Sequence, residues 1–200
     1  SAGSIVPQSG AAITTVSVDP AGANVAFGTT GGGVYLYDVA AGTKRQIRAA
    51  QFFTGSSEQY RTESVDIAPD GAHLAAAIEH TPASPLIEGD TWVYSYDLEG
   101  VSAVIGFGAF QHTTDFCLQY PLANQVRYTP DSANVLMVFG STCSVIAGSC
   151  TNSGAAFRIG AAIGGYQEAA VSYPVRSVSA TNTSALILLV GCGANNVATV

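Results

Sequence analysis

The chain has 200 residues, of which 48% are hydrophobic and 10% are charged. This apolar content supports a sizeable buried core, and the low charge leaves a surface rich in small uncharged side chains. The 7 Lys and Arg residues against 14 acidic ones give a formal net charge of -7, which argues against binding along nucleic-acid phosphates. The longest run of bulky aliphatic residues, 186–190, is far shorter than the roughly 20 residues of a membrane-spanning helix, so we expect no membrane insertion.

A strand-and-turn pattern occurs three times along the sequence. Each copy is an alternating apolar strand followed by a turn that contains Pro. The three turns are Asp19-Pro20-Ala21-Gly22, Ala68-Pro69-Asp70-Gly71 and Thr129-Pro130-Asp131-Ser132. Because Pro fixes φ and Gly supplies a left-handed conformation, these residues predict tight turns and not ligand sites. Repetition over tens of residues indicates one supersecondary unit copied several times.

Taken in chain order, the alternation of apolar and polar residues predicts four units of antiparallel strands. The first unit has strands at residues 14–18, 24–29, 34–38 and 44–49. The second has strands at 64–68, 73–79, 91–97 and 101–107. The third begins at residue 125 and continues at 134–140, 155–159 and 166–173. The fourth, near 176 and at 185–190 and 196–200, lacks a fourth strand, which residues 4–6 could supply.

Two Tyr-rich strands that end in Asp and one turn carry a family resemblance. These segments are Tyr35-Leu36-Tyr37-Asp38, Tyr94-Ser95-Tyr96-Asp97 and Pro69-Asp70-Gly71. They resemble the WD40-like and TolB-like group of β-propeller repeats. The resemblance implies a single all-β domain over residues 1–200, a β-propeller of about four four-stranded antiparallel blades. We expect the blades at about 14–49, 63–107, 124–173 and 175–200 plus 1–8. Either the N-terminal strand or another copy of the chain closes the ring.

Long connections are predicted on one face of such a propeller, at residues 50–63, 80–90, 108–124 and 141–154. Long loops on a rigid scaffold commonly carry binding residues. The candidate binding face consists of the aromatic residues and one His of these loops: Phe52, Phe53, Tyr60, Phe110, His112, Phe116 and Tyr120. The alternative is that these side chains fold back over the ring as local cores.

The chain has four cysteines and one glycosylation acceptor pattern. Cys143 and Cys150 bracket a short loop-like stretch that a disulfide would rigidify, which leaves Cys117 and Cys192 as the other pair. Four reduced, buried thiols are the alternative. Together with Asn182-Thr183-Ser184, the cysteines favour an extracellular or cell-surface protein, with Asn182 as the glycosylation site.

No spacing of residues in the sequence indicates catalysis. His73, His80 and His112 stand in different units without metal-ligand spacing, and no Gly-x-Ser-x-Gly pattern marks a nucleophile. Gly31-Gly32-Gly33 lacks the Lys and the helix of a phosphate-binding loop and is interpreted as a hairpin turn. We therefore expect no catalytic residues, no metal and no cofactor.

The sequence favours a non-enzymatic extracellular module with a structural or protein-interaction role. Its partner would be another protein or copies of itself, as in a repeating subunit of a surface assembly or filament. One alternative is a propeller that binds carbohydrate or a small ligand through its aromatic loops. A less favoured alternative is a propeller hydrolase or quinoprotein-like enzyme, which needs acidic residues or His converging on the central channel.

Overall fold

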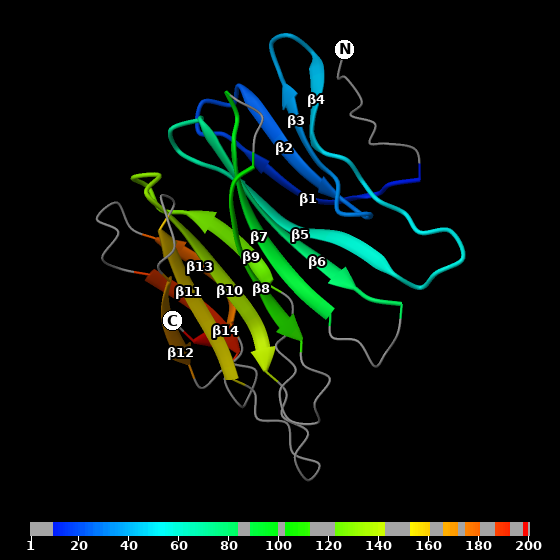
Figure 1. The fold of residues 1–200 in the computed structure, drawn as a ribbon. Coiled ribbons are helices and arrows are strands. Elements are labelled where there is room, and N and C mark those ends of the chain that lie inside the picture. Colours follow the sequence, from blue (N-terminus) through cyan, green and yellow to red (C-terminus); the bar gives the residue numbers. More distant parts are fainter. Residues whose placement is uncertain are drawn as a thin grey trace.

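The computed structural model describes residues 10–83, 89–99, 103–112, 123–142, 153–160, 166–171, 175–180, 187–192 and 198–199. The strands in these ranges form four antiparallel sheets, which follow one another in chain order (Figure 1). The prediction of an all-β chain built from antiparallel units is confirmed. Residues 1–8, which were expected to close the ring, lie outside the described residues.

Each sheet is built from consecutive strands. The first consists of β1 (Ile13–Val18), β2 (Asn24–Thr29), β3 (Val34–Asp38) and β4 (Thr43–Arg48). The second consists of β5 (Gln59–Ile67), β6 (His73–Thr81), β7 (Gly89–Asp97) and β8 (Ala103–His112). The third consists of β9 (Ala123–Tyr128), β10 (Asn134–Thr142), β11 (Ser153–Gly160) and β12 (Tyr166–Val171). The fourth contains β13 (Val175–Ala180), β14 (Ile187–Cys192) and β15 (Ala198–Thr199).

The repeated turns connect the first two strands of the first three sheets. Their fourth residues, Gly22, Gly71 and Ser132, have φ of 70°, 72° and 59°. The left-handed conformation is thus a property of the turn position, and the third copy adopts it with a side chain present. The interpretation of this pattern as turn chemistry is confirmed.

Two strands of the second sheet extend beyond their predicted ends. β5 begins at Gln59 because Gln59 and Tyr60 pair with Thr81 and His80, and β8 reaches His112, which pairs with Gly89. The placement of Tyr60, Phe110 and His112 in loops is therefore wrong, since all three lie in strands. Cross-strand pairing continues here through residues that the apolar alternation does not mark.

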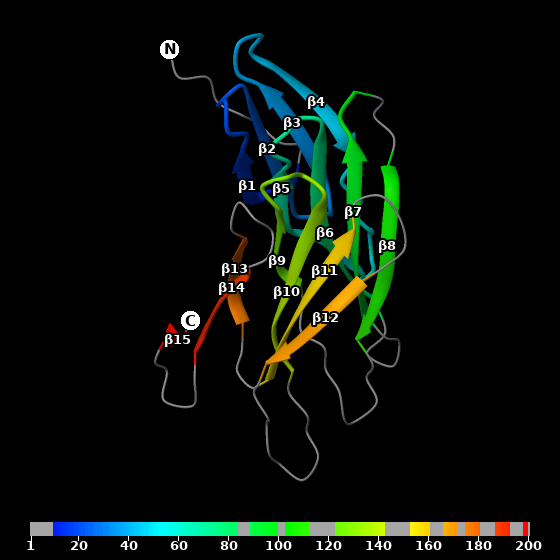
Figure 2. The same ribbon diagram turned by 90° about the vertical axis from the view of Figure 1, so that its left-hand side faces the viewer.

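Small side chains allow neighbouring sheets to pack closely. On β6, Ala76 belongs to the core shared with the first sheet, whereas Ala75 and Ala77 belong to the core shared with the third. All three are fully buried, as expected for a strand covered on both faces. Figure 2 shows the resulting order, with β9–β12 between the second and fourth sheets.

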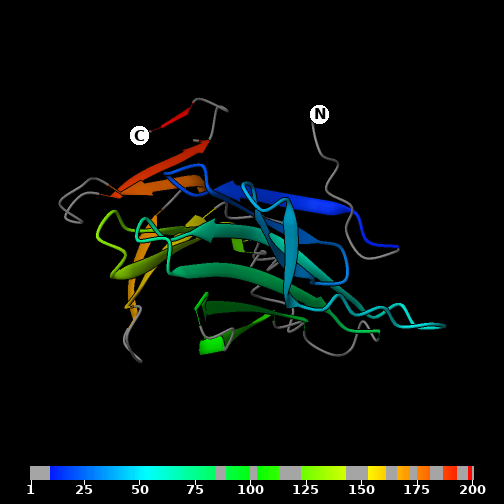
Figure 3. The ribbon, with the colours of Figure 1, turned by 90° about the horizontal axis from the view of Figure 1, so that it is seen from above.

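The first strands of the sheets form the inner packing layer. β5 packs against β1 and β2, β9 against β5 and β6, and β13 against β9 and β10. The chain of sheets curves as it proceeds: seen from above, β1, β13 and β14 lie toward one side and β7 and β8 toward the other (Figure 3). No comparable packing joins β13 or β14 to β1 among the described strands. The described sheets therefore form an arc with two ends.

Candidate functional site

The connection between β4 and β5 folds back across the turn between β2 and β3. Gly31 donates a backbone hydrogen bond to Tyr60 O (2.7 Å) and accepts one from Gln51 N (2.8 Å). Phe52 pairs with Gln59 in an isolated antiparallel bridge at the base of the connection. These main-chain bonds hold the loop, which the sequence placed on the binding face, against the first sheet.

Two glycines of the Gly31-Gly32-Gly33 turn allow the loop to approach closely, because they have no side chain. Gly31 and Gly32 have φ of 78° and 71°, a region that favours glycine. A Cβ on Gly31 would lie 2.8 Å from Phe52 Cζ, and one on Gly32 would lie 2.9 Å from the Cβ of Tyr60. The hairpin interpretation is therefore correct, and the turn also forms the floor on which aromatic side chains rest.

Aromatic and cationic side chains gather above this floor. The rings of Phe53 and Tyr60 have centroids 5.7 Å apart, and Tyr60 stacks on His80 at 4.5 Å. The Arg48 guanidinium lies 5.4 Å from the centre of the Tyr60 ring, and its Nη1 donates to Gly32 O (2.7 Å). Tyr60 thus contacts three neighbouring side chains and forms the centre of the cluster.

A hollow of about 320 Å³ opens beside this cluster. Phe52, Phe53 and Tyr60 line it with aromatic surface. Polar side chains also line it: Gln51, Ser56, Glu58, Gln59 and Arg61. Phe52 and Phe53 are 51% and 39% exposed, so they present large apolar surfaces to solvent. We call this site, from Gln51 to Arg61 with Thr30 and Gly31, the aromatic hollow.

Two pairs of charged or ionisable groups stand at the edge of the aromatic hollow. His80 Nε2 lies 2.9 Å from Glu58 Oε1, and Arg61 Nε lies 2.8 Å from Glu63 Oε1. Burial raises the pKa of Glu63, opposed by Arg61 and supported by the neighbouring Glu79 carboxyl. The His80–Glu58 contact joins the end of β6 to the β4–β5 connection, and the Arg61–Glu63 pair lies along β5.

The structure brings together three members of the predicted binding face, Phe52, Phe53 and Tyr60. Tyr60 packs against the core between the first and second sheets, as expected if the loop side chains fold back as a local core. Phe52 and Phe53 remain exposed, as expected for a binding face. Phe110 and His112 have a described backbone in β8 only, and Phe116 and Tyr120 lie outside the described residues.

Sequence analysis did not assign Arg48, Glu58 and His80 to this site. A strand register that pairs Tyr60 with His80 would have placed His80 beside the loop, and Arg48 is the last residue of β4, directly before the loop. The predicted disulfides and glycosylation are not tested, because Cys117, Cys143, Cys150 and Asn182 lie outside the described residues. Cys192 ends β14, where it pairs with Ala198.

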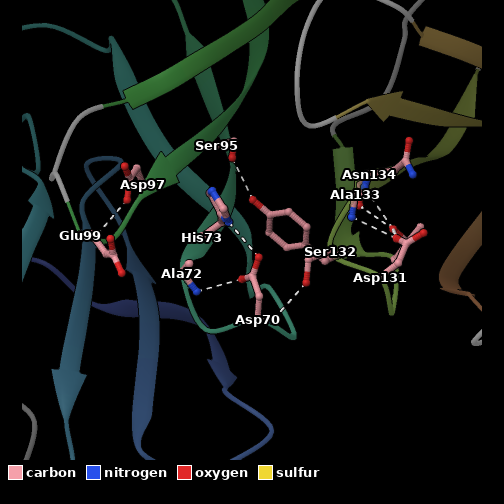
Figure 4. A network of polar contacts seen from close by, with 12 residues as sticks. Asp70, Ala72, His73, Ser95, Asp97, Glu99, Asp131, Ser132, Ala133 and Asn134 are labelled. Atoms are coloured by element: carbon pink, nitrogen blue, oxygen red, sulfur yellow. Dashed lines mark hydrogen bonds and ion pairs between the residues drawn. The ribbon is translucent and has the colours of Figure 1, made fainter.

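The turns of the second and third sheets are joined by a polar network (Figure 4). Asp70 N donates to Ser132 Oγ (3.0 Å), and the Asp70 carboxylate accepts from Ala72 N (2.8 Å). Away from the turns, the hydroxyls of Ser95 and Tyr128 lie 2.8 Å apart in the buried interface. Burial raises the pKa of Tyr128 to about 12, although the hydrogen bond to Ser95 opposes the shift. The Asp70–Ser132 and Ser95–Tyr128 hydrogen bonds thus join the second sheet to the third, and the Asp70–Ala72 bond stabilises the turn.

Two further kinds of site were sought in the described ranges. No group of three or more His, Cys, Asp or Glu side chains there is placed to hold a metal ion. Among the same residues, no helix has the length and apolar character needed to span a bilayer.

Comparisons with known proteins identify the architecture. No protein-family model and no curated protein matches the sequence. The β-propeller domain of Cps50 (Swd1) from Myceliophteria thermophila, 11% identical, matches 92% of this chain and 51% of its own with a TM-score of 0.58. The tricorn protease, 15% identical, matches 74% of this chain and 13% of its own with a TM-score of 0.48. This chain thus spans about half the length of the Cps50 domain. Its fold is that of a β-propeller, as the resemblance to the WD40-like and TolB-like group implied.

Proposed function

We propose that the chain is a protein-interaction module that binds its partner at the aromatic hollow. The observation that carries the proposal is the exposure of Phe52 and Phe53 on a loop held by backbone hydrogen bonds. Exposed aromatic side chains on a rigid scaffold give large contact areas at low entropic cost, and they dominate the binding energy of many interfaces. The fold agrees with this role, although folds of this kind host many functions.

The lining of the hollow indicates what a partner must present. Phe52, Phe53 and Tyr60 offer surface for an apolar or aromatic side chain, and Gln51 and Arg61 in the same lining offer hydrogen-bonding groups for its neighbours. A short peptide segment with one bulky apolar residue between polar residues has this chemistry.

Selection from a random peptide library on the immobilised chain tests the proposal. We expect selected peptides to share a bulky apolar residue and to bind F52A/F53A at least 10-fold more weakly, because aromatic anchors contribute roughly 2 kcal/mol or more. V39A is the matched control, since Val39 is 49% exposed in the turn that follows β3. Peptides that bind F52A/F53A as tightly as the parent chain would contradict the proposal.

Carbohydrate binding is the second candidate function. It is favoured by one observation, the placement of the Gln51, Ser56 and Gln59 side chains beside aromatic walls in one hollow. Sugar rings stack on aromatic faces while their hydroxyls pair with amide and hydroxyl groups. A glycan array should give signals that F52A/F53A loses. An array without signal above background removes this candidate.

The extracellular or cell-surface location and the structural role in an assembly remain proposals from the sequence. Their support is the low charge, the four cysteines and the Asn182-Thr183-Ser184 pattern. Peptide mapping under non-reducing conditions tests the redox part directly. We expect a peptide pair linked through Cys143 and Cys150, and free thiols at these positions in natively isolated protein would argue for a reducing compartment.

A further inference from the structure

Two apolar residues in the first strand of a sheet are buried in the second and third sheets, whereas the equivalent two are exposed in the first sheet. Val65 and Ile67 of β5 are buried in the core with Ala26 and Leu36 of the first sheet. In the third sheet, Val126 and Tyr128 of β9 are buried against the Ala-rich strand β6. The first strand of a sheet therefore covers the sheet that precedes it, with alternate residues facing that neighbour.

Val16 and Val18 hold the same positions in β1. Each stands at the same distance before its repeated turn as the buried pairs do, yet Val16 and Val18 are 58% and 57% exposed. Ser17, between these two valines, faces the second sheet and donates to Asp66 Oδ1 (3.2 Å). Because side chains alternate along a strand, Val16 and Val18 face the opposite side. The apolar side of β1 therefore points away from the described sheets, where a preceding blade would lie.

Within the described part of the chain, the backbone of β1 also lacks a contact that the first strands of the next two sheets make. Ile67 N donates to Ser17 Oγ (3.3 Å) and Tyr128 N donates to Asp66 Oδ2 (2.7 Å), so each sheet is tied to the one before it. In both sheets the next N–H along the chain bonds within its own hairpin. Asp19 N does the same with Asn24 O (3.1 Å), so the N–H of Val18 points out of its sheet. Among the described residues, no side chain accepts from Val18 N.

We propose that the fourth sheet of a second copy of this chain packs on the exposed face of β1. The first two strands of the fourth sheet pair in the same register as those of the first and second sheets. Ser179 pairs with Leu188 as Ser17 pairs with Ala26 and Asp66 with Ala75. Ser179 therefore holds the position that accepts the N–H bond in the other interfaces, and Leu188 holds the apolar position of Ala26 and Ala75.

Closure within one chain is disfavoured by the shape of the arc. Strands β13 and β14 do not pack on β1 in the way that β5 and β9 pack on their predecessors, within the described ranges. Among the described strands, the first sheet lies at one end of the arc and the fourth at the other, so a head-to-tail contact between copies joins complementary ends. This interface is separate from the aromatic hollow.

Light scattering coupled to size-exclusion chromatography over a range of concentrations tests the proposal on the full chain. We expect a mass of at least twice the 20.4 kDa of one chain, with a constant dimer if two arcs close a ring and a mass that grows with concentration if they extend. V16D/V18D should return the mass to that of one chain, because two carboxylates then face the apolar neighbour. V39D, which places a charge at another exposed apolar site, should leave the assembly intact.

Mixing the two proteins tests the head-to-tail direction. V16D/V18D retains an intact fourth sheet, so a tagged sample should still capture untagged parent chain. A parent chain of 20.4 kDa at every concentration overturns the proposal, as does an assembly that survives V16D/V18D. Failure of the tagged variant to capture parent chain also overturns it, because two β1 faces would then pair with each other. A single cooperative thermal transition shows that V16D/V18D is folded, and its midpoint should match that of the parent chain at concentrations where the parent dissociates.

Discussion

At the residue scale, Asp19 organises the first of the repeated turns. Its carboxylate accepts hydrogen bonds from Ala23 N (2.8 Å), Asn24 N (2.8 Å) and Asn24 Nδ2 (2.9 Å). Burial acts to raise the pKa of Asp19, but these hydrogen bonds outweigh it and lower the pKa below its usual value. The other two turns have Ala68 and Thr129 at this position, and there the carboxylates of Asp70 and Asp131 accept the turn N–H bonds. The same turn is thus stabilised by Asp at two different positions.

The lowered pKa of Asp19 gives a pH-dependent stability with a defined sign. The ionised form is favoured in the folded state, so its contribution is present above the unfolded pKa and is lost as the pH falls through the lower, folded pKa. We expect D19A to reduce the free energy of unfolding by about 1 to 3 kcal/mol at pH 7, because three partly buried hydrogen bonds to a charged acceptor are lost. Urea titrations at pH 7 and pH 3 measure the difference between D19A and the parent chain. A difference that is equal at both pH values would refute this role of the ionised carboxylate.

At the element scale, the Gly31-Gly32-Gly33 turn and the β4–β5 connection form one unit. The turn has no side chains in the space that Arg48, Phe52 and Tyr60 occupy. Backbone conformation and close approach both require glycine at Gly32, whereas Gly22 has a similar φ of 70° with no atom close enough to meet a Cβ. Substitution at Gly22 therefore measures the free-energy cost of the left-handed backbone alone, and substitution at Gly32 adds the cost of the steric contact.

Alanine at these two glycines should have unequal effects. G22A carries only the left-handed backbone cost of about 1 to 2 kcal/mol. G32A carries the same cost and also displaces Tyr60, which adds about 1 to 3 kcal/mol in a packed site. Denaturant unfolding of both variants gives the difference, and peptides selected on the parent chain should bind G32A more weakly than G22A. Equal losses of stability and binding would mean that the loop does not rest on this turn.

At the scale of the whole molecule, the sequence predicts the hairpins of each sheet better than it predicts contacts between distant strands and between sheets. The alternation and the Pro-containing turns predicted the hairpins because both are local properties of the chain. The extension of β5 to Gln59 depends on pairing with Thr81, and the assembly of Arg48, Tyr60 and His80 depends on register between distant strands, so neither has a local signal. The exposure of Val16 was also unpredictable, because the same apolar alternation is buried wherever a preceding sheet covers it.

We propose the aromatic hollow as the binding site of this propeller, and a small aromatic probe tests this most directly. Indole is a suitable probe because it combines an aromatic face with one N–H donor. A titration with indole followed by amide nuclear magnetic resonance of the parent chain measures where it binds. We predict that the largest shift changes fall on the amides of residues 30–31 and 51–61, and that F52A/F53A abolishes them. Shift changes centred elsewhere on the propeller, or the same changes in F52A/F53A, would contradict the claim.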